Sequence, residues 1–262
     1  MIGAYWARQA DAAELVASSE SKERLLTSVS HEIRTPLIAI LGLSEEIISS
    51  RTSLGEEELD ELNGIIAVQS RELAELVEDL LVASRADFGN LSIRLEQISL
   101  RRQVDMVLEG VRESHPTDQA VTSLGTNVDA WAYPLRVRQI MRNLLTNAIK
   151  YGGPSVVIGV REHNGLAQVV VADDGQGVPV HESDLIFERY YRSADTPTQP
   201  GSVGIGLAVS RQLAEMMGGN LVYIHGENQH RFELSLPLAI PATVNKSSPS
   251  LTVVAGAPQP IG

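Results

Sequence analysis

Apolar residues recur at alternating intervals of three and four along two stretches of the first third of the chain, residues 26–47 and 59–80. Each stretch has the spacing of the seam of a left-handed helix pair over about three heptads. The segment 49–55 between them is polar, and the glutamates at 56–58 place negative charge where a second helix would begin. The pattern predicts a long antiparallel helical hairpin over residues 21–90.

Further apolar residues widen this seam beyond a narrow strip: Ile48, Ile65, Val77 and Leu81. A two-helix hairpin cannot cover such a face, whereas two hairpins packed as a four-helix bundle can. The sequence therefore predicts a homodimer. The alternative is a bundle within one chain, completed by a helical extension at residues 1–20, where the heptad register is weak.

The pattern changes after residue 90, where short β-branched runs alternate with longer stretches of helical period. Together they predict an α/β-sandwich domain over residues 91–240, with helices on one face of a largely antiparallel sheet. A segment rich in Pro, Ser, Thr and Ala, residues 241–262, is expected to be a disordered tail. The predicted strands are 91–95, 156–160, 168–172, 221–225 and 231–236, and the predicted helices are 100–113, 134–151 and 204–217.

The composition excludes several classes of protein. Hydrophobic residues make up 43% and charged residues 21% of the 262 positions, which is ordinary globular usage. No apolar run reaches the ~18–20 residues of a membrane span, and the first ten residues do not form a signal peptide. The absence of cysteine excludes disulfides and thiolate sites, and a net charge of −12 argues against nucleic acid as the main partner. A cytoplasmic protein is expected.

The first candidate for chemistry is His31, which the heptad pattern places on the solvent side of the first helix. An isolated surface histidine usually has no role. Here Glu32 follows it directly, and Pro36 lies inside the helix, where proline costs ~3 kcal/mol. A neutral imidazole can accept a phosphoryl group at one nitrogen while Glu32 holds the proton on the other, and the Thr35 hydroxyl, one turn later, can position a water.

A polar stripe marks the helix predicted at 134–151. Asn143, Asn147, Lys150 and Tyr151 follow one another at i, i+4, i+7 and i+8, on one helix face. Amide oxygens are suitable ligands for Mg²⁺, and lysine can meet phosphate charge. A simple solvated helix face is the alternative.

Two glycine-rich turns follow. Asp173 ends a strand and leads into Gly175 and Gly177, so that a carboxylate can accept a hydrogen bond from an adenine amine while the backbone passes close to a ligand. Gly204 and Gly206 open a helix whose free N–H groups can face phosphate. The polar stretch between the turns, residues 182–200, is expected to be a mobile lid.

The segment from Ser30 to Leu37, Ser-His-Glu-Ile-Arg-Thr-Pro-Leu, resembles the phosphoacceptor box of the sensor histidine kinases of bacterial two-component systems. The resemblance implies that His31 is autophosphorylated, that Glu32 assists, and that Thr35 serves phosphatase activity toward a response regulator.

The later segments resemble, in order, the N, G1, F and G2 boxes of the catalytic domain of the same family, which has a Bergerat-type nucleotide fold. The likeness extends over residues 21–238 and implies ATP and Mg²⁺ as cofactors, with Asn147 as the Mg²⁺ ligand and Asp173 as the adenine contact. The implied nucleotide site comprises Asn143, Asn147, Lys150, Tyr151, Asp173, Gly175, Gly177, Arg192, Gly204, Gly206 and Leu207.

Two positions depart from the family pattern. Ser202 stands where the first glycine of the G2 box is expected, and Gly201 can substitute for it only through a shift of one residue. Tyr133 replaces the aspartate that often precedes the helix with Pro134, so a helix N-cap is lost.

The resemblance implies autophosphorylation of His31, transfer to an aspartate of a response regulator receiver domain, and phosphatase activity. Related ATPases carry a glutamate where Asn143 stands, and an amide cannot act as that base. The alternatives are a degenerate kinase that acts as an ATP-binding scaffold, and a protein in which phosphatase activity dominates. A hinge is expected near 87–90, and contact with a membrane only through a sensor region that this chain does not contain.

Overall fold

The computed structural model describes residues 29–51, 53–87, 93–114, 119–191, 204–226, 229–239 and 252–253. Its contacts divide the chain into two compact units, of which the first runs to Glu78 and the second begins at Asp79. The division falls within helix α2 (Glu56–Asp87) rather than at the predicted hinge near 87–90, most of which lies outside the described residues. The predicted extension at 1–20 also lies outside them.

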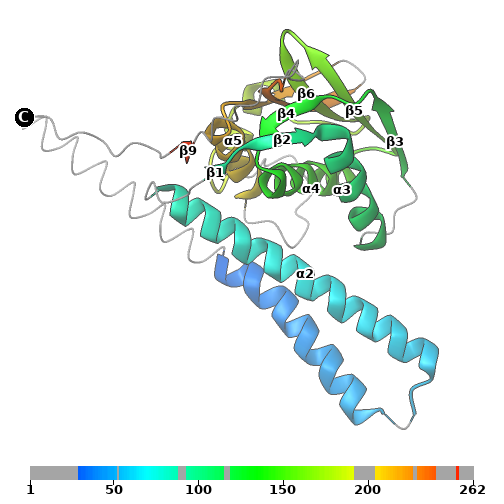
Figure 1. Cartoon of the computed structure of the whole chain (residues 1–262). Helices are drawn as coiled ribbons and strands as arrows, with labels where there is room; N and C mark the ends of the chain where they lie inside the picture. Colours follow the sequence, from blue (N-terminus) through cyan, green and yellow to red (C-terminus); the bar gives the residue numbers. More distant parts are fainter. Residues whose placement is uncertain are drawn as a thin grey trace, which may run out of the picture. The chain divides into compact units, whose positions relative to one another are not determined.

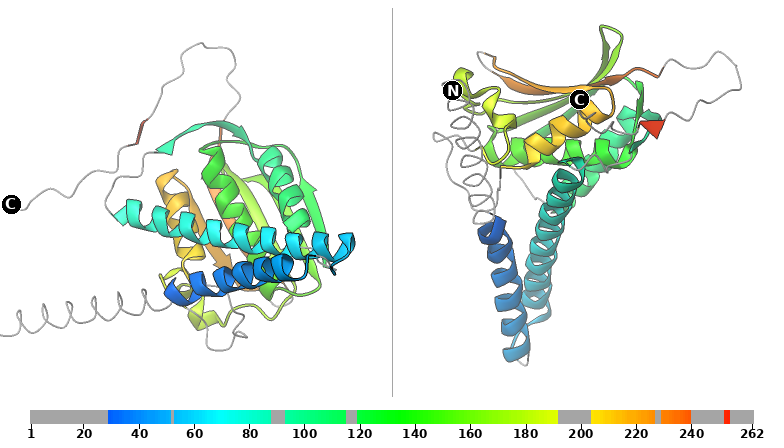
Figure 2. Two further views of the ribbon diagram at one scale, coloured as in Figure 1. Left: turned by 90° about the horizontal axis from the view of Figure 1, so that it is seen from below. Right: turned by 90° about the vertical axis from the view of Figure 1, so that its left-hand side faces the viewer.

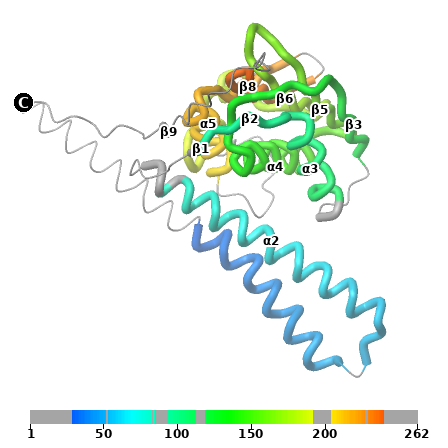
Figure 3. Tube along the Cα trace, in the orientation of Figure 1, coloured from blue at the N-terminus to red at the C-terminus, as the bar shows by residue number. Residues whose placement is uncertain are grey.

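The first unit contains the predicted helical hairpin. A helix over residues 29–49 is followed by a short turn and then by α2, drawn from blue to cyan in Figures 1 and 3. The Glu58 carboxylate accepts the backbone N–H of Gly55 at 3.0 Å and so caps the start of α2. The hairpin and its turn are therefore confirmed where the structure describes them.

Burial along the hairpin follows the predicted seam. Seam residues such as Ile40 and Leu73 are half-buried, and Pro36 is buried. The flanking residues remain exposed, to 75% for Ile48, 42% for Ile65, 41% for Val77 and 44% for Leu81. Two helices thus cover their shared seam but leave the flanks to solvent.

The second unit is an α/β sandwich (Figure 2). Three helices, α3 (Leu100–Ser114), α4 (Pro134–Tyr151) and α5 (Gly206–Met216), cover one face of a five-stranded sheet in the order β3-β5-β6-β8-β7. The β3–β5 pair is parallel and the other three pairs are antiparallel, so the predicted fold class is confirmed. The strands are β3 (Ala120–Gly125), β5 (Ser155–His163), β6 (Leu166–Asp173), β7 (Asn220–Ile224) and β8 (His230–Pro237).

Several short elements were not predicted from the sequence. Strands β2 (Glu96–Ser99) and β4 (Asp129–Ala132) pair antiparallel. Strand β9 (Thr252–Val253) lies in the segment predicted to be a disordered tail, and it pairs with β1 (Ile93–Arg94), which lies within the predicted strand 91–95. Two 3₁₀ turns, η1 (Val180–Glu182) and η2 (Leu185–Phe187), follow the first glycine-rich turn.

The core lies between the helices and the inner face of the sheet. Alternation along the strands directs every second side chain inward, which explains why Val156, Ile158, Val169 and Leu234 are fully buried. They meet fully buried residues of the helices, including Leu100, Ile140, Met141, Leu144, Leu145 and Leu213.

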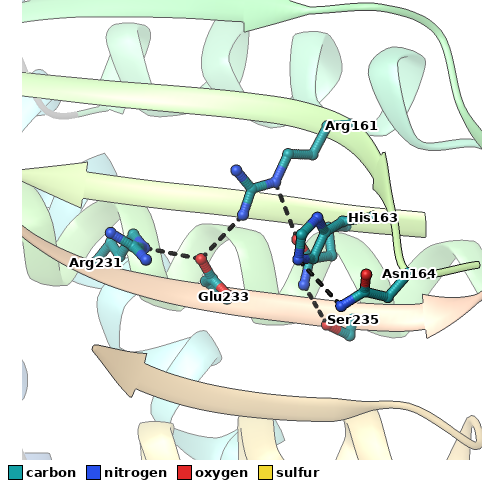
Figure 4. Close-up of polar contacts among 7 residues, drawn as sticks. Arg161, His163, Asn164, Arg231, Glu233 and Ser235 are labelled. Atoms are coloured by element: carbon teal, nitrogen blue, oxygen red, sulfur yellow. Dashed lines mark hydrogen bonds and ion pairs between the residues drawn. The ribbon is translucent and has the colours of Figure 1, made fainter. Parts of the chain in front are cut away.

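The opposite face of the sheet carries a polar network (Figure 4). Glu233 accepts hydrogen bonds from Arg161 at 3.1 Å and from Arg231 at 2.8 Å, and Gln168 donates to the Ser235 hydroxyl at 2.9 Å. These bonds tie β5, β6 and β8 together and neutralise the buried carboxylate of Glu233. Of the helices that the structure describes, none combines the length and the apolar character needed to cross a bilayer.

Candidate functional site

His31 lies on the exposed surface of the first helix, as the heptad pattern predicts. The helix continues through Pro36, and the Thr35 hydroxyl donates a hydrogen bond to the His31 carbonyl at 3.2 Å. Glu32 is only 5% exposed, in contrast to its neighbour. The imidazole is therefore accessible to a large substrate, and a carboxylate adjacent in the chain is held out of solvent.

The second candidate site is built on α4. Pro134 occupies the first turn, and Tyr133, the N-cap residue, provides no side-chain hydrogen bond, as its departure from the family pattern predicts. Asn143 donates to the Ser210 hydroxyl of α5 at 3.0 Å, and a Cβ on Gly206 would lie 2.4 Å from the Asn143 Oδ1. The start of α5 can therefore approach α4 this closely only because residue 206 is glycine.

Asn147 lies one turn further along α4 and is partly exposed. Within the part of the chain that the structure describes, its side chain forms no hydrogen bond, so its amide oxygen is available to a ligand. Lys150 and Tyr151 follow on the same face and are both partly buried.

The residues present fit a magnesium ion that arrives with a nucleotide. No group of three His, Cys, Asp or Glu side chains able to hold a metal is found among the described residues. Mg²⁺ keeps waters and shares phosphate oxygens, so one amide oxygen such as that of Asn147 is a sufficient protein contribution.

Asp173, at the end of β6, is the acidic group of this site. Its Oδ1 accepts the backbone N–H of Gly175 at 3.0 Å, and its side chain is largely buried. Burial raises the pKa of Asp173, and the Gly175 hydrogen bond and the attraction of His230 oppose that effect in part. A further hydrogen-bond donor that reaches the second carboxylate oxygen would therefore stabilise the charged form of Asp173.

Glycines allow the Asp173 turn to pack against the end of α4. A Cβ on Gly152 would lie 2.9 Å from the Asp173 Cβ, and a Cβ on Gly175 would lie 2.8 Å from the Gly152 backbone. A Cβ on Gly153 would approach the Asp174 carboxylate to 2.4 Å. The structure thus brings the stripe on α4 and the first glycine-rich turn together.

A backbone hydrogen bond joins the middle of the predicted lid to the second glycine-rich turn. Tyr190 donates its N–H to the Gly204 carbonyl at 2.9 Å, and both residues have a positive φ, 68° and 70°. A Cβ on Gly204 would lie 2.7 Å from the Tyr191 carbonyl oxygen. Residues 192–200 of the lid, with Arg192, and also Gly201 and Ser202, lie outside the described residues, so the predictions for them remain untested. Leu207 lies in the first turn of α5.

Sequence reasoning missed three residues that support this site. Ser210 holds the Asn143 amide, and the Tyr223 hydroxyl accepts the Val178 N–H at 2.8 Å. Burial raises the pKa of Tyr223, which therefore stays protonated. His230 packs against Gly177, where a Cβ would lie 2.3 Å from the imidazole ring. No local pattern marks these residues, because each acts through a partner remote in sequence.

Two known domain families match the chain in the order of its two units. Residues 21–89 match the His Kinase A (phospho-acceptor) domain, and residues 132–240 match the histidine kinase-, DNA gyrase B- and HSP90-like ATPase family. The chain is therefore a member of the sensor histidine kinases of two-component systems.

Individual relatives agree with this assignment. The chain is 35% identical over 217 residues to the signal transduction histidine-protein kinase/phosphatase MprB of Mycolicibacterium vanbaalenii, an alignment that covers 79% of this chain and 43% of MprB. It thus spans less than half the length of that relative.

Two solved structures are also similar. A mycobacterial sensor histidine kinase MprB structure has 26% identity and a TM-score of 0.51, covering 55% of this chain and 98% of that one. The full-length ShkA structure in complex with AMPPNP has 26% identity and a TM-score of 0.58, covering 84% of this chain and 47% of that one.

Proposed function

We propose that this chain is an ATP-dependent protein histidine kinase that phosphorylates itself on His31 and passes the phosphoryl group to an aspartate of a response regulator receiver domain. The proposal rests on the presence of two features in one chain. One unit carries an exposed imidazole, and the other brings the polar stripe of α4 together with the glycine-rich turns. The similar ShkA structure holds an ATP analogue, which supports ATP as the nucleotide.

In this proposal the second unit holds the nucleotide. Asp173 accepts a hydrogen bond from the adenine amine, the Asn147 amide oxygen contributes to Mg²⁺, and the N–H groups at the start of α5 face the phosphates. Magnesium supplies charge neutralisation on the phosphate oxygens when it is bound. Asn143 holds the start of α5 through Ser210, and Lys150 adds positive charge on the same side.

The transfer step forms a phosphorus–nitrogen bond at His31 and breaks the bond between the γ-phosphorus and the bridging oxygen, so that ADP leaves. Glu32 accepts a hydrogen bond from the other imidazole nitrogen and so holds its proton in place, or it takes that proton. Since Asn143 stands where related ATPases have a glutamate base, transfer to His31 is favoured over hydrolysis. The phosphoryl group then passes to the receiver aspartate. In the opposing phosphatase activity, the Thr35 hydroxyl positions a water that hydrolyses the aspartyl phosphate and releases inorganic phosphate.

The proposed assembly is a homodimer through the hairpins, whose exposed apolar flanks are the surface that a second copy would bury. The intramolecular alternative, which involves residues 1–20, lies outside the described residues. Because ATP and receiver domains are cytoplasmic, we place the catalytic reaction in the cytoplasm.

Incubation with γ-labelled ATP tests the proposal. The unaltered chain should acquire label that is lost in acid and retained in base, and His31→Gln should reduce the label to background. His163→Gln is the matched control, because this histidine is also exposed but lies on the second unit. Label that survives His31→Gln would refute the acceptor assignment, and a chain that binds ATP but acquires no label would support the scaffold alternative.

A further inference from the structure

His230 is a buried polar residue that the proposed reaction does not use. It is 6% exposed, and its Nδ1 is fully enclosed. Among the described residues no hydrogen bond reaches either ring nitrogen. A buried polar atom without a partner is costly, and such an atom in a native structure commonly awaits a ligand or a bound water.

The position of His230 brings it to the nucleotide turn. His230 begins β8, and its register partner on β6 is Asp173, so the two side chains point to the same face of the sheet, about 5 Å apart at Cβ. Gly177 of the same turn lies directly on the imidazole. The Tyr223 ring stacks on His230 at 6.2 Å between centroids, and the His225 ring lies at 4.6 Å, tilted by 45°, so both neighbours restrict the orientation of the imidazole.

This arrangement matches the edge of an adenine base. The exocyclic amine donates hydrogen bonds, and the ring nitrogens on its two sides, N1 and N7, accept them. A carboxylate beside an imidazole N–H offers the complementary pair, an acceptor next to a donor. A 6-oxopurine presents the opposite pattern on its N1 side, with an acceptor at the oxygen and a donor at N1.

We propose that His230 is a nucleobase-selecting residue that donates a hydrogen bond, directly or through one water, to a ring nitrogen beside the amine that Asp173 accepts. This inference rests on the proposed binding of ATP. Phenylalanine would fill a purely apolar position without leaving a nitrogen unpaired, so the imidazole is explained by a polar contact that the bound base supplies.

Adenine analogues test the contact. Binding of ADP, 1-deaza-ADP and 7-deaza-ADP to the full chain is measured by calorimetry. Each deaza base keeps the amine but lacks one acceptor nitrogen. One of the two analogues should bind about five- to tenfold more weakly than ADP, the loss of a single hydrogen bond. The other analogue should bind within twofold of ADP.

Variants then assign that loss to His230. His230→Phe should bind ADP about five- to tenfold more weakly and should no longer distinguish the deaza base. His230→Gln, which keeps an N–H donor, should restore the discrimination. His225→Phe is the matched control, because this neighbouring imidazole is exposed, and it should leave the discrimination unchanged.

The outcomes separate the two proposals. If the unaltered chain binds ADP and both deaza analogues equally, or if His230→Phe retains the discrimination, the role of His230 is refuted while ATP binding stands. If the unaltered chain binds none of the three nucleotides, the proposed function itself fails. If His230→Phe does not fold, the analogues are compared on the unaltered chain and on His230→Gln instead. Equal binding of ADP and both deaza analogues to the unaltered chain would then refute the role of His230.

Discussion

Asp173, the proposed adenine contact, is a buried carboxyl whose ionisation costs stability. Its carboxyl is buried at the end of β6, and burial raises its pKa because the charged form is poorly solvated. In the unfolded chain the same carboxyl is fully hydrated. Folding therefore favours the protonated form, and ionisation of Asp173 at neutral pH works against the folded state until a ligand donor compensates it.

Asp173→Asn should accordingly separate binding from stability. The amide still accepts the Gly175 N–H but carries no charge, so the unliganded variant should unfold at a higher temperature than the parent near neutral pH. The stability difference should disappear below the ordinary aspartate pKa, because the parent carboxyl is then protonated in both states. ADP should bind about 10- to 100-fold more weakly, as expected for the loss of a charge-assisted hydrogen bond. Thermal unfolding from pH 3 to pH 8 and calorimetric binding measure both effects, and a variant less stable at neutral pH would contradict this account.

Gly177 and Gly165 form a natural matched pair at the residue scale. Both have left-handed backbone, with φ of 68° and 73°, but a Cβ would lie 2.3 Å from the His230 ring at Gly177 and would meet nothing within 4 Å at Gly165.

Alanine at Gly165 should therefore cost only the backbone strain, about 1 kcal/mol. Alanine at Gly177 should cost that amount and about 1–3 kcal/mol more, because the enclosed imidazole cannot move away freely. Chemical denaturation of the two variants gives the difference directly. Equal losses of stability would show that the contact with His230 is unimportant.

At the scale of elements, the sheet and the hairpin differ in how completely their faces are covered. Helices α3 to α5 cover one face of the sheet, and the opposite face is occupied by the network around Glu233. The hairpin has no such cover for its flanks, where Ile48 and Ile65 stay exposed. Exposed apolar faces of this kind are typical of surfaces that bind a partner.

Ile65→Ser should therefore weaken the proposed dimer. Every substitution appears twice in a symmetric dimer, and burial of an isoleucine is worth about 1.5–3 kcal/mol, so the dissociation constant should rise at least about tenfold. Sedimentation equilibrium measures it. Ala67→Ser, two residues further along α2 and therefore on a different helix face, should leave association nearly unchanged. An unaltered chain that is monomeric at all concentrations would exclude the dimer.

At the scale of the whole molecule, the two units should respond to different ligands. In the proposed function, nucleotide binds to the second unit, whereas a second copy of the chain binds to the hairpin. Each stabilises the unit that it contacts, because ligands that bind only the folded form shift its unfolding equilibrium.

Calorimetric unfolding should consequently show two transitions. ADP at 100 times its dissociation constant should stabilise the sheet unit by about 2.7 kcal/mol and leave the hairpin transition in place. Raising the protein concentration should shift the hairpin transition upward and leave the other nearly unchanged. A single transition that moves with both variables would show that the units unfold together.

Local patterns were sufficient for the long elements. The 3–4 spacing located both hairpin helices, and Pro134 and Gly218 marked the start of α4 and the end of α5, where Gly218 has a φ of 74°. The Asn164-Gly165 turn between β5 and β6, where both residues have a positive φ, was not predicted. The strands β2 and β4 were missed because they have only four residues each, and β3 was missed because half of it consists of Ala, Ser and Gly, which do not favour strands.

The sequence by itself determined the helical hairpin with its exposed histidine and the residue types of the nucleotide site, because heptad spacing and short motifs depend on near neighbours in the chain. Only the tertiary structure decided that β3 runs parallel to β5, that Ser210 holds Asn143, and that His230 faces Asp173. These relations depend on strand register and on close packing at Gly177 and Gly206. Such contacts join residues 35 or more positions apart, and the periodicity of a helix or strand relates only residues close together in the chain.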